Sequence, residues 1–176
     1  MTKESSKEEV YKAVLNAAVE LEIQLGHLKW TYTLLARRSK ISRSLIYYYF
    51  GKSKINILKE ATLLFGQELS GVVEDRMKYW EEGQIENGLL KTRELFKVYP
   101  YLVPFYFLYR NKDNEIGELI RKYENEGHKK RKKFFPHIEE SKLKALYAFH
   151  LGLVTFPELN REDVITACNI LNQYFK

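Results

Sequence analysis

The chain has 176 residues, of which 45% are hydrophobic and 30% are charged, so it holds enough apolar side chains to bury a core. This balance excludes an intrinsically disordered chain, because disordered chains combine few apolar residues with a high net charge. The first ten residues lack the apolar stretch of a secretory signal, and no apolar run reaches the roughly 20 residues of a membrane-spanning helix. We therefore expect a folded cytoplasmic protein with no membrane partner.

The positive charge is concentrated near the N-terminus. The net charge is +6, and residues 1–60 carry 11 Lys and Arg against 6 Asp and Glu, so most of the excess lies in this third of the chain. No acidic residue lies between Glu22 and Glu60, whereas eight Lys and Arg do. A surface of one sign raises the local concentration of polyanions, although an ordinary solvated basic face has the same composition.

The first predicted helix covers residues 7–25. Ser6 and Glu9 have the spacing of a capping box, in which each side chain bonds the backbone N–H of the other residue. Apolar residues then recur every three or four positions as far as Leu25, and Gly26 is a suitable C-terminal cap.

Two short helices are predicted next, over residues 32–39 and 43–50. Thr31 and Ser42 are suitable N-caps for them, because a hydroxyl oxygen accepts a hydrogen bond from the first backbone N–H groups of a helix. Helices this short are unstable alone, and the short turn between them makes them pack at an angle. This is the layout of a helix-turn-helix.

The rest of the chain shows helical patterns only. A fourth helix begins near Lys54, with Ser53 as its N-cap, and runs through Leu69. The further predicted helices cover residues 85–98, 101–110, 113–133, 140–156 and 161–175. The expected fold is therefore all-α, with an N-terminal helix-turn-helix domain over residues 1–52 and a helical C-terminal domain over residues 53–176.

The predicted helix over residues 43–50 has two different faces. Helical spacing places Ile46, Tyr49 and Phe50 together, and we expect this apolar set to pack inward. The residues on another face are Arg43, Ser44, Tyr47 and Tyr48. An arginine can read guanine edges and hydroxyl groups can bind phosphates, so the second set is suited to nucleic acid.

The stretch LLARRSKISRSLIYYYF, Leu34 to Phe50, resembles the DNA-binding signature of TetR-type transcriptional regulators. The matching residues, all in one register, are Ala36, Ile41, Ser42, Ile46, Tyr47, Tyr49 and Phe50. The resemblance covers about residues 10–60. It implies that the N-terminal domain binds double-stranded DNA and that the C-terminal domain serves regulation and dimerisation.

The resemblance also implies which side chains contact DNA. Those that would hold phosphates are Thr31, Thr33, Ser42, Tyr47 and Lys54, and those placed to reach bases are Arg43, Ser44 and Tyr48. The stretch FGKSK is one residue longer than the common FKSK of the family, so either Lys52 or Lys54 holds the phosphate at that point. Ser44, Leu45 and Leu34 depart from the usual pattern, which leaves the target sequence unknown.

The last two predicted helices are apolar on more than one side. A helix of this kind must be covered on both sides, either by a partner subunit or by the rest of a monomer. We expect a homodimer joined by the last two helices, with a completely buried central helix in a monomer as the alternative. A dimer would present two recognition helices to a roughly palindromic operator.

The aromatic segment around residues 98–110 has two interpretations. Its large side chains either line a pocket for a small hydrophobic or aromatic ligand or belong to an ordinary core. The pocket interpretation rests mainly on the resemblance, which implies that small molecules are sensed. The candidate ligand-binding residues are Tyr99, Tyr101, Phe105, Tyr106 and Tyr109, together with His150, which is otherwise a hydrogen-bonded core histidine.

Other chemistry has little support in the sequence. Cys168 is the only cysteine and is expected to be an inert buried side chain. The basic run HKKRKKFF, residues 128–135, is typical of a solvated helix end, where cations are favourable. No common catalytic motif is present, so we expect no enzyme activity, no metal site and no cofactor.

The function expected from the sequence is that of a DNA-binding repressor that a small molecule releases from its operator. The direction of regulation follows from the resemblance alone. The alternative is a DNA-binding or protein-interaction module that has no small-molecule ligand.

Overall fold

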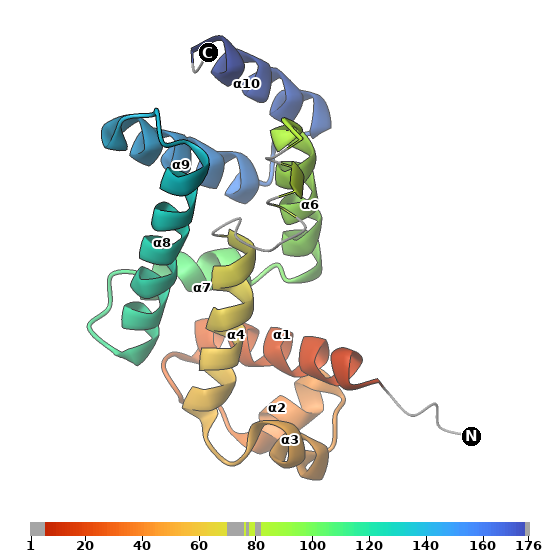
Figure 1. The fold of residues 1–176 in the computed structure, drawn as a ribbon. Helices are drawn as coiled ribbons and strands as arrows, with labels where there is room; N and C mark the ends of the chain where they lie inside the picture. The colour runs from red at the N-terminus through yellow and green to blue at the C-terminus, as the bar shows by residue number, and fades with distance from the viewer. Residues whose placement is uncertain (1–5, 70–75, 77, 80–81, 175–176) are drawn as a thin grey trace. The chain divides into compact units, whose positions relative to one another are not determined.

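The computed structural model describes residues 6–69, 76, 78–79 and 82–174, and these residues form nine α-helices and no strand (Figure 1). The prediction of an all-α fold is confirmed. Contacts between Cα atoms divide the chain into two compact units, unit 1 with Met1–Phe65 and Tyr99–Ile120, and unit 2 with Gly66–Val98 and Arg121–Lys176. The functional boundary expected between residues 52 and 53 stays a prediction.

Unit 1 begins with three helices at the predicted positions, α1 (Lys7–Leu25), α2 (Tyr32–Ser39) and α3 (Arg43–Phe50). The predicted capping box is present, since the Ser6 backbone N–H donates to Glu9 Oε2 at 2.8 Å and the Glu9 backbone N–H donates to Ser6 Oγ at 3.2 Å. The unit also includes most of α4 (Lys54–Leu69), all of α7 (Leu102–Tyr109) and the start of α8 (Glu115–Phe134).

The core of unit 1 lies where α1 packs against α2 and α7. Side chains with no exposed surface come from all three of these helices, from α3 and from the loop after α1, and they include Val14, Trp30, Leu35, Ile46 and Phe105. Each fully buried side chain of this size contributes about 1.5–3 kcal/mol to folding. The short helices α2 and α3 are therefore held by tertiary packing rather than by their own helix propensity.

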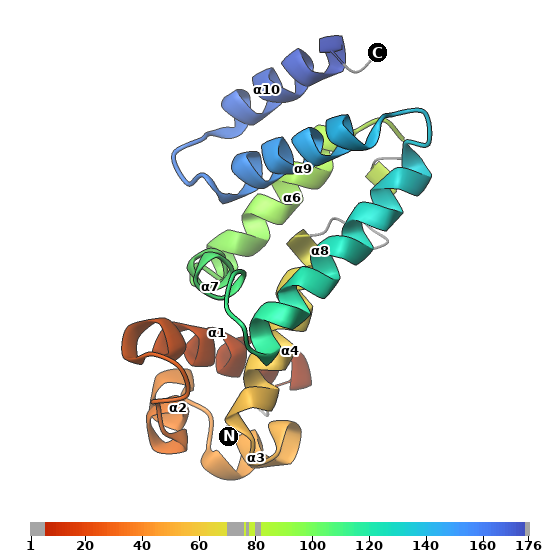
Figure 2. The same ribbon diagram turned by 90° about the vertical axis from the view of Figure 1, so that its left-hand side faces the viewer.

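Unit 2 contains α6 (Ile85–Val98), most of α8, α9 (Glu140–Thr155) and α10 (Arg161–Tyr174), and α6 packs against both α9 and α10 (Figure 2). The guanidinium group of Arg93 on α6 donates to the backbone carbonyls of Leu153, Phe156 and Leu159. These carbonyls belong to the end of α9 and the loop after it, where helix geometry leaves acceptors without an intrahelical partner. One side chain therefore fixes α6 to α9 and to the connection with α10.

The predicted C-terminal helices agree with the observed ones to within two residues at each end. Residue 175, the last residue predicted to be helical, lies outside the described residues. Within the described part of the chain, no helix combines the length and the apolar character that crossing a membrane requires.

Candidate nucleic-acid interface and cavity

The turn between α2 and α3 is held by the side chain of Ser39. Its hydroxyl donates to the Leu35 carbonyl at 2.7 Å and accepts from the Ile41 backbone N–H at 3.3 Å. Lys40 lies between them in the left-handed conformation, with a φ of 58°, which ends α2. The turn between the two helices is thus held by local hydrogen bonds and by one residue in the left-handed conformation.

Both short helices begin at the predicted N-caps. The Leu34 backbone N–H donates to Thr31 Oγ1 at 3.2 Å, and the Leu45 backbone N–H donates to Ser42 Oγ at 3.3 Å. Both capping residues are exposed. A helix N-terminus of this kind favours an anion such as a phosphate.

Helix α3 divides into the two faces that its sequence predicts. Ile46 and Phe50 are buried, and Tyr49 is half-buried against the ring of Tyr11 at a centroid distance of 5.8 Å. Arg43 and Tyr48 are exposed on the other face, where Tyr48 keeps 79% of its surface accessible. A tyrosine this exposed contributes little to the core, so α3 presents a large amphipathic side chain at the surface.

Tyr47 lies between the two faces and contacts the side chains of two neighbouring cations, Arg43 and Lys52. Its hydroxyl accepts a hydrogen bond from Arg43 Nη2 at 3.0 Å, and its ring lies 4.8 Å from the ring of Tyr32. Lys52 Nζ lies 5.9 Å from the centre of the Tyr47 ring. Burial, together with the neighbouring Tyr47, raises the pKa of Tyr32. The cluster holds two positive charges near one hydroxyl group, which suits a phosphate oxygen.

Lys52 and Lys54 have different surroundings. Lys54 Nζ donates to the Leu28 carbonyl at 2.7 Å and lies 5.4 Å from the centre of the Trp30 ring, so its charge is held within unit 1. Lys52 is exposed in the turn between α3 and α4. Of the two lysines that the sequence left as alternatives, Lys52 is the one that extends toward solvent.

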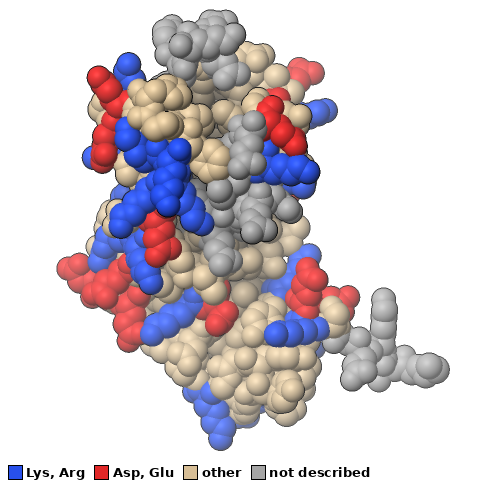
Figure 3. Space-filling view, viewed as in Figure 1, with Lys and Arg blue, Asp and Glu red and all other residues tan. Residues whose placement is uncertain are grey.

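The nine predicted DNA-binding residues all lie in unit 1, in α2, α3, the turns beside them and the first residue of α4. Seven are exposed, namely Thr31, Thr33, Ser42, Arg43, Ser44, Tyr48 and Lys52, and two, Tyr47 and Lys54, are half-buried. Figure 3 shows Lys and Arg side chains at the α3 end of this unit. All nine residues therefore belong to unit 1, seven of them at its surface, and their contacts with DNA stay a prediction.

The buried carboxylate of Glu22 joins the loop after α1 to α7, a role that the sequence analysis missed. It accepts from Trp30 Nε1 at 2.7 Å and from the Leu28 backbone N–H at 3.0 Å, and His27 Nδ1 lies 2.8 Å away. The Tyr109 hydroxyl also donates to it, and burial beside this carboxylate raises the pKa of Tyr109. The available signal was an acid at a position of α1 that helical spacing assigns to the apolar stripe.

The aromatic segment belongs to the core of unit 1. Phe105, Tyr106 and Tyr109 are buried there, and the half-buried Tyr101 donates to Glu20 on α1 at 3.1 Å. Tyr99 is also buried. None of the five predicted aromatic residues is among the described residues that line the cavity of unit 2. The structure thus agrees with the core interpretation of this segment, and it places the segment and His150 in different units.

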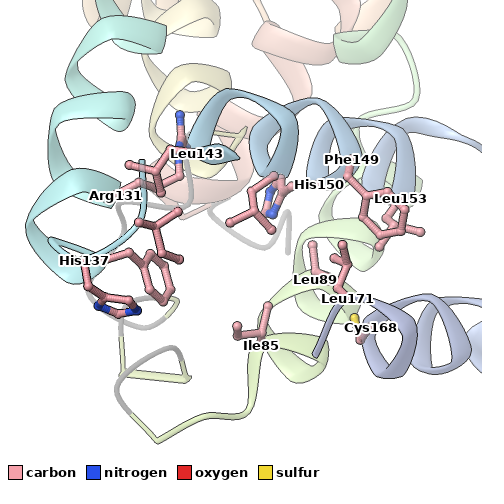
Figure 4. A pocket seen from close by; sticks show the side chains of 13 residues that line it. Ile85, Leu89, Arg131, His137, Leu143, Phe149, His150, Leu153, Cys168 and Leu171 are labelled. Carbon is pink, nitrogen blue, oxygen red and sulfur yellow. The ribbon is translucent and has the colours of Figure 1, made fainter. Parts of the chain in front are cut away.

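Unit 2 contains a cavity of about 210 Å³ lined by its four helices and the loop after α8 (Figure 4). The lining includes Ile85, Leu89, Arg131, Ile138, Leu143, Phe149, His150, Leu153, Cys168 and Leu171. Most of these side chains are apolar, and no acidic residue is among the described residues that line the cavity. Of the predicted ligand-binding residues, the cavity includes His150.

Three side chains that line the cavity, Arg131, His150 and Cys168, have shifted pKa values. Burial lowers the pKa of Arg131, which is 5% exposed and lies 4.2 Å from the centre of the Tyr147 ring, but an arginine keeps its charge at neutral pH. Burial, followed by the charge of Arg131, lowers the pKa of His150 to about 3, so its imidazole is neutral. Burial raises the pKa of Cys168 to about 11, which keeps the thiol protonated and unreactive.

Arg131 is a cavity residue that the sequence analysis missed, because it lies within a run interpreted as a solvated helix end. Lys129, Lys130 and Lys133 of that run are exposed, as expected, and Lys and Arg gather over this end of α8 (Figure 3). The helical spacing of Ile120, Gly127 and Arg131, all buried, was the available signal, since it assigns the arginine to the apolar side of α8. In the part of the chain that the structure describes, no group of three or more metal-ligating side chains is present.

The structure is similar to a solved one, the crystal structure of a HlyIIR mutant protein with a segment substituted by alanine. The similarity covers 97% of both chains, with a TM-score of 0.52 and 16% sequence identity. No family model matches the chain, and no curated protein matches it. At this identity the comparison shows the fold, which is all-α with an N-terminal helix-turn-helix and a helical C-terminal region.

Proposed function

We propose that this protein is a sequence-specific DNA-binding transcription regulator of the TetR type. The observation that carries the proposal is the division of α3 into a buried face with Ile46 and Phe50 and an exposed face with Arg43, Ser44 and Tyr48. A recognition helix needs such a division, because one face fixes it to the domain while the other enters the major groove. The capped N-terminus of α3 and the exposed Lys52 supply phosphate contacts beside it.

In this proposal the protein acts as a homodimer joined by α9 and α10. Large apolar side chains remain accessible on and beside these helices, with Ile170 on α10 49% exposed and Phe156 after α9 58% exposed. Along α9, Ala145 and Ala148 are exposed and Phe149 is half-buried. A second subunit would cover this apolar surface and bring two copies of α3 to one operator with two-fold symmetry.

In this proposal a small molecule in the cavity of unit 2 lowers the affinity of the dimer for its operator, and the protein acts as a repressor, a direction of regulation that follows from the resemblance alone. The cavity favours this function over that of a binding module with no ligand, because it is mostly apolar and contains a few polar groups, as ligand sites do. Binding there would release DNA by stabilising a dimer in which the two α3 helices no longer match the operator.

Selection of bound fragments from the source genome, followed by fluorescence anisotropy, tests the proposal. The selected fragments should share a roughly palindromic site, and affinity for them should fall steeply with salt. Arg43→Ala should weaken binding to the selected site by about 1–3 kcal/mol and relax the preference at one base position. Tyr47→Phe should weaken binding to all sequences alike.

Lys142→Ala, which removes an exposed charge of unit 2, is the matched control and should leave affinity unchanged. A selection that enriches no sequence over random DNA would refute the proposed function. Equal losses of Arg43→Ala on the selected site and on random DNA would refute the base-reading role of Arg43 alone.

A further inference from the structure

The charged group of the cavity lies at one side of it. Arg131 and His137 lie at that side together with the apolar Leu143, and Leu153 and Leu171 lie at the other side, with His150 between them (Figure 4). A ligand that matches this lining has a polar head and an apolar body. The lining thus fixes the orientation of the ligand as well as its general polarity.

The charged side of the cavity is suited to a carboxylate. The guanidinium group of Arg131 is positioned by the ring of Tyr147 and is almost completely removed from solvent. A guanidinium presents N–H donors in a planar fork that matches the two oxygens of a carboxylate, and this pairing strengthens where water is excluded. The described residues of the cavity lining include no Asp or Glu. The Glu124 carboxylate, which lies outside this lining, also acts on the charge of Arg131, so a ligand carboxylate would share the guanidinium group with it.

His150 adds a second polar contact without adding charge. Its Nε2 atom is buried, and its neutral imidazole has one donor and one acceptor nitrogen. It therefore suits a carboxylate oxygen or a neutral polar group of the ligand.

The volume of the cavity limits the apolar body. A cavity of about 150 Å³ in another protein holds benzene, and the present one, at about 210 Å³, is larger. One aromatic ring with a short acid chain, or an alkyl chain of similar volume, therefore fits this space. Leu89, Leu153 and Leu171 from three different helices would contact the body.

We infer that this cavity binds small apolar monocarboxylic acids, with the carboxylate at Arg131 and the hydrocarbon body against α6, α9 and α10. One part of the inference rests on the proposed function, namely that binding of such an acid releases the protein from DNA. Binding of the acid itself depends on unit 2 alone.

Calorimetric titration of the full-length protein with two pairs of compounds tests the inference. The acids are octanoate and 4-phenylbutyrate, and their neutral counterparts are octanamide and 4-phenylbutyramide, which have almost the same size and shape. At least one acid should bind, and it should bind at least roughly tenfold more tightly than its amide, since a hydrogen bond to a charged group is worth more than one between neutral groups. Equal or tighter binding of the amides, or no binding of either acid, would overturn the inference.

Variants at neighbouring positions of α8 locate the carboxylate. Arg131→Gln should reduce the affinity for the acid to that for the amide, and Arg131→Lys should give an intermediate value because it keeps the charge and loses the fork. Lys130→Gln removes the same charge from an exposed position of the same helix and should change neither affinity. If Arg131→Gln does not fold, the ratio of acid to amide affinity in the unaltered protein still tests the inference.

Anisotropy with operator DNA separates this inference from the proposed function. If the acids bind and DNA stays bound, the inference stands and the proposed release by ligand fails. If neutral compounds release the operator and the acids do not bind, the proposed function stands and the inference is overturned.

Discussion

Glu22 on α1 and Tyr109 on α7 are 87 residues apart in the chain and share a buried hydrogen bond within unit 1. The same carboxylate accepts from Trp30 and from the backbone of Leu28, so it joins α1, the loop before α2 and α7. A buried carboxylate is stabilising only when donors surround it, because the charge loses its hydration. Here the donors come from the elements that position the helix-turn-helix.

Glu22→Gln should destabilise unit 1 by about 3 kcal/mol, because the amide NH₂ group would face donors of Trp30 and Tyr109 and leave one of them without an acceptor. The midpoint of urea denaturation, followed by tryptophan fluorescence, measures this effect. Glu8→Gln, at an exposed position of the same helix, is the control and should change stability by less than about 0.5 kcal/mol. A similar loss of stability in both variants would show that the buried hydrogen bonds of Glu22 contribute no more to folding than an exposed carboxylate does.

Lys52 and Lys54 should differ in what their removal changes. Lys52→Ala should weaken DNA binding and reduce the salt dependence of affinity by about one unit of slope, with stability unchanged, because this exposed side chain is free to bind a phosphate. Lys54→Ala should instead lower stability by about 1–3 kcal/mol, because it removes a charged donor from the Leu28 carbonyl. Anisotropy at several salt concentrations and urea denaturation separate the two effects, and the reverse assignment would contradict this prediction.

His150 should make the folded protein sensitive to mild acid. Its pKa is lowered to about 3 from an ordinary value of 6.5, so below pH 6.5 the unfolded chain binds a proton that the folded chain does not. The free energy of unfolding therefore falls as the pH falls from 6.5 toward 3. His150→Gln removes this contribution, and its urea midpoint should fall less between pH 7 and pH 5 than that of the unaltered protein.

The exposed His137 supplies the control for this measurement, since His137→Gln should keep the steeper fall. Parallel pH profiles of His150→Gln and the unaltered protein would show that His150 is not the group responsible.

Ile170→Glu should convert the proposed dimer into a monomer. The substitution places a charge where the partner subunit would cover an apolar side chain, which costs several kcal/mol if the charge is buried without a partner. Light scattering during size-exclusion chromatography should give about half the mass of the unaltered protein. Asn125→Glu, at an exposed position of α8, should keep the dimer mass. A monomer mass for the unaltered protein at all concentrations would remove the dimer from the proposal.

The order of residues was enough to predict the ends of the described helices to within two residues and the two faces of α3. These features depend on neighbours close in the chain, as in the capping box of Ser6 and Glu9, the N-caps Thr31 and Ser42, and the apolar spacing of Ile46 and Phe50. Local hydrogen bonds and helical periodicity act over three or four residues, so they can be read directly from the order of residues.

Which charged and aromatic side chains are buried follows from tertiary packing, which the sequence patterns do not contain. The sequence does not distinguish three charged residues from the charged residues that are exposed, namely Glu22, Lys54 and Arg131. In the structure each of them contacts groups from elsewhere in the chain. The sequence allowed either a pocket or a core for the aromatic side chains of α7, and the packing of α7 on α1 buries Phe105, Tyr106 and Tyr109 in unit 1. The physical reason is that burial and pairing of a polar group depend on residues far along the chain, which periodicity does not contain.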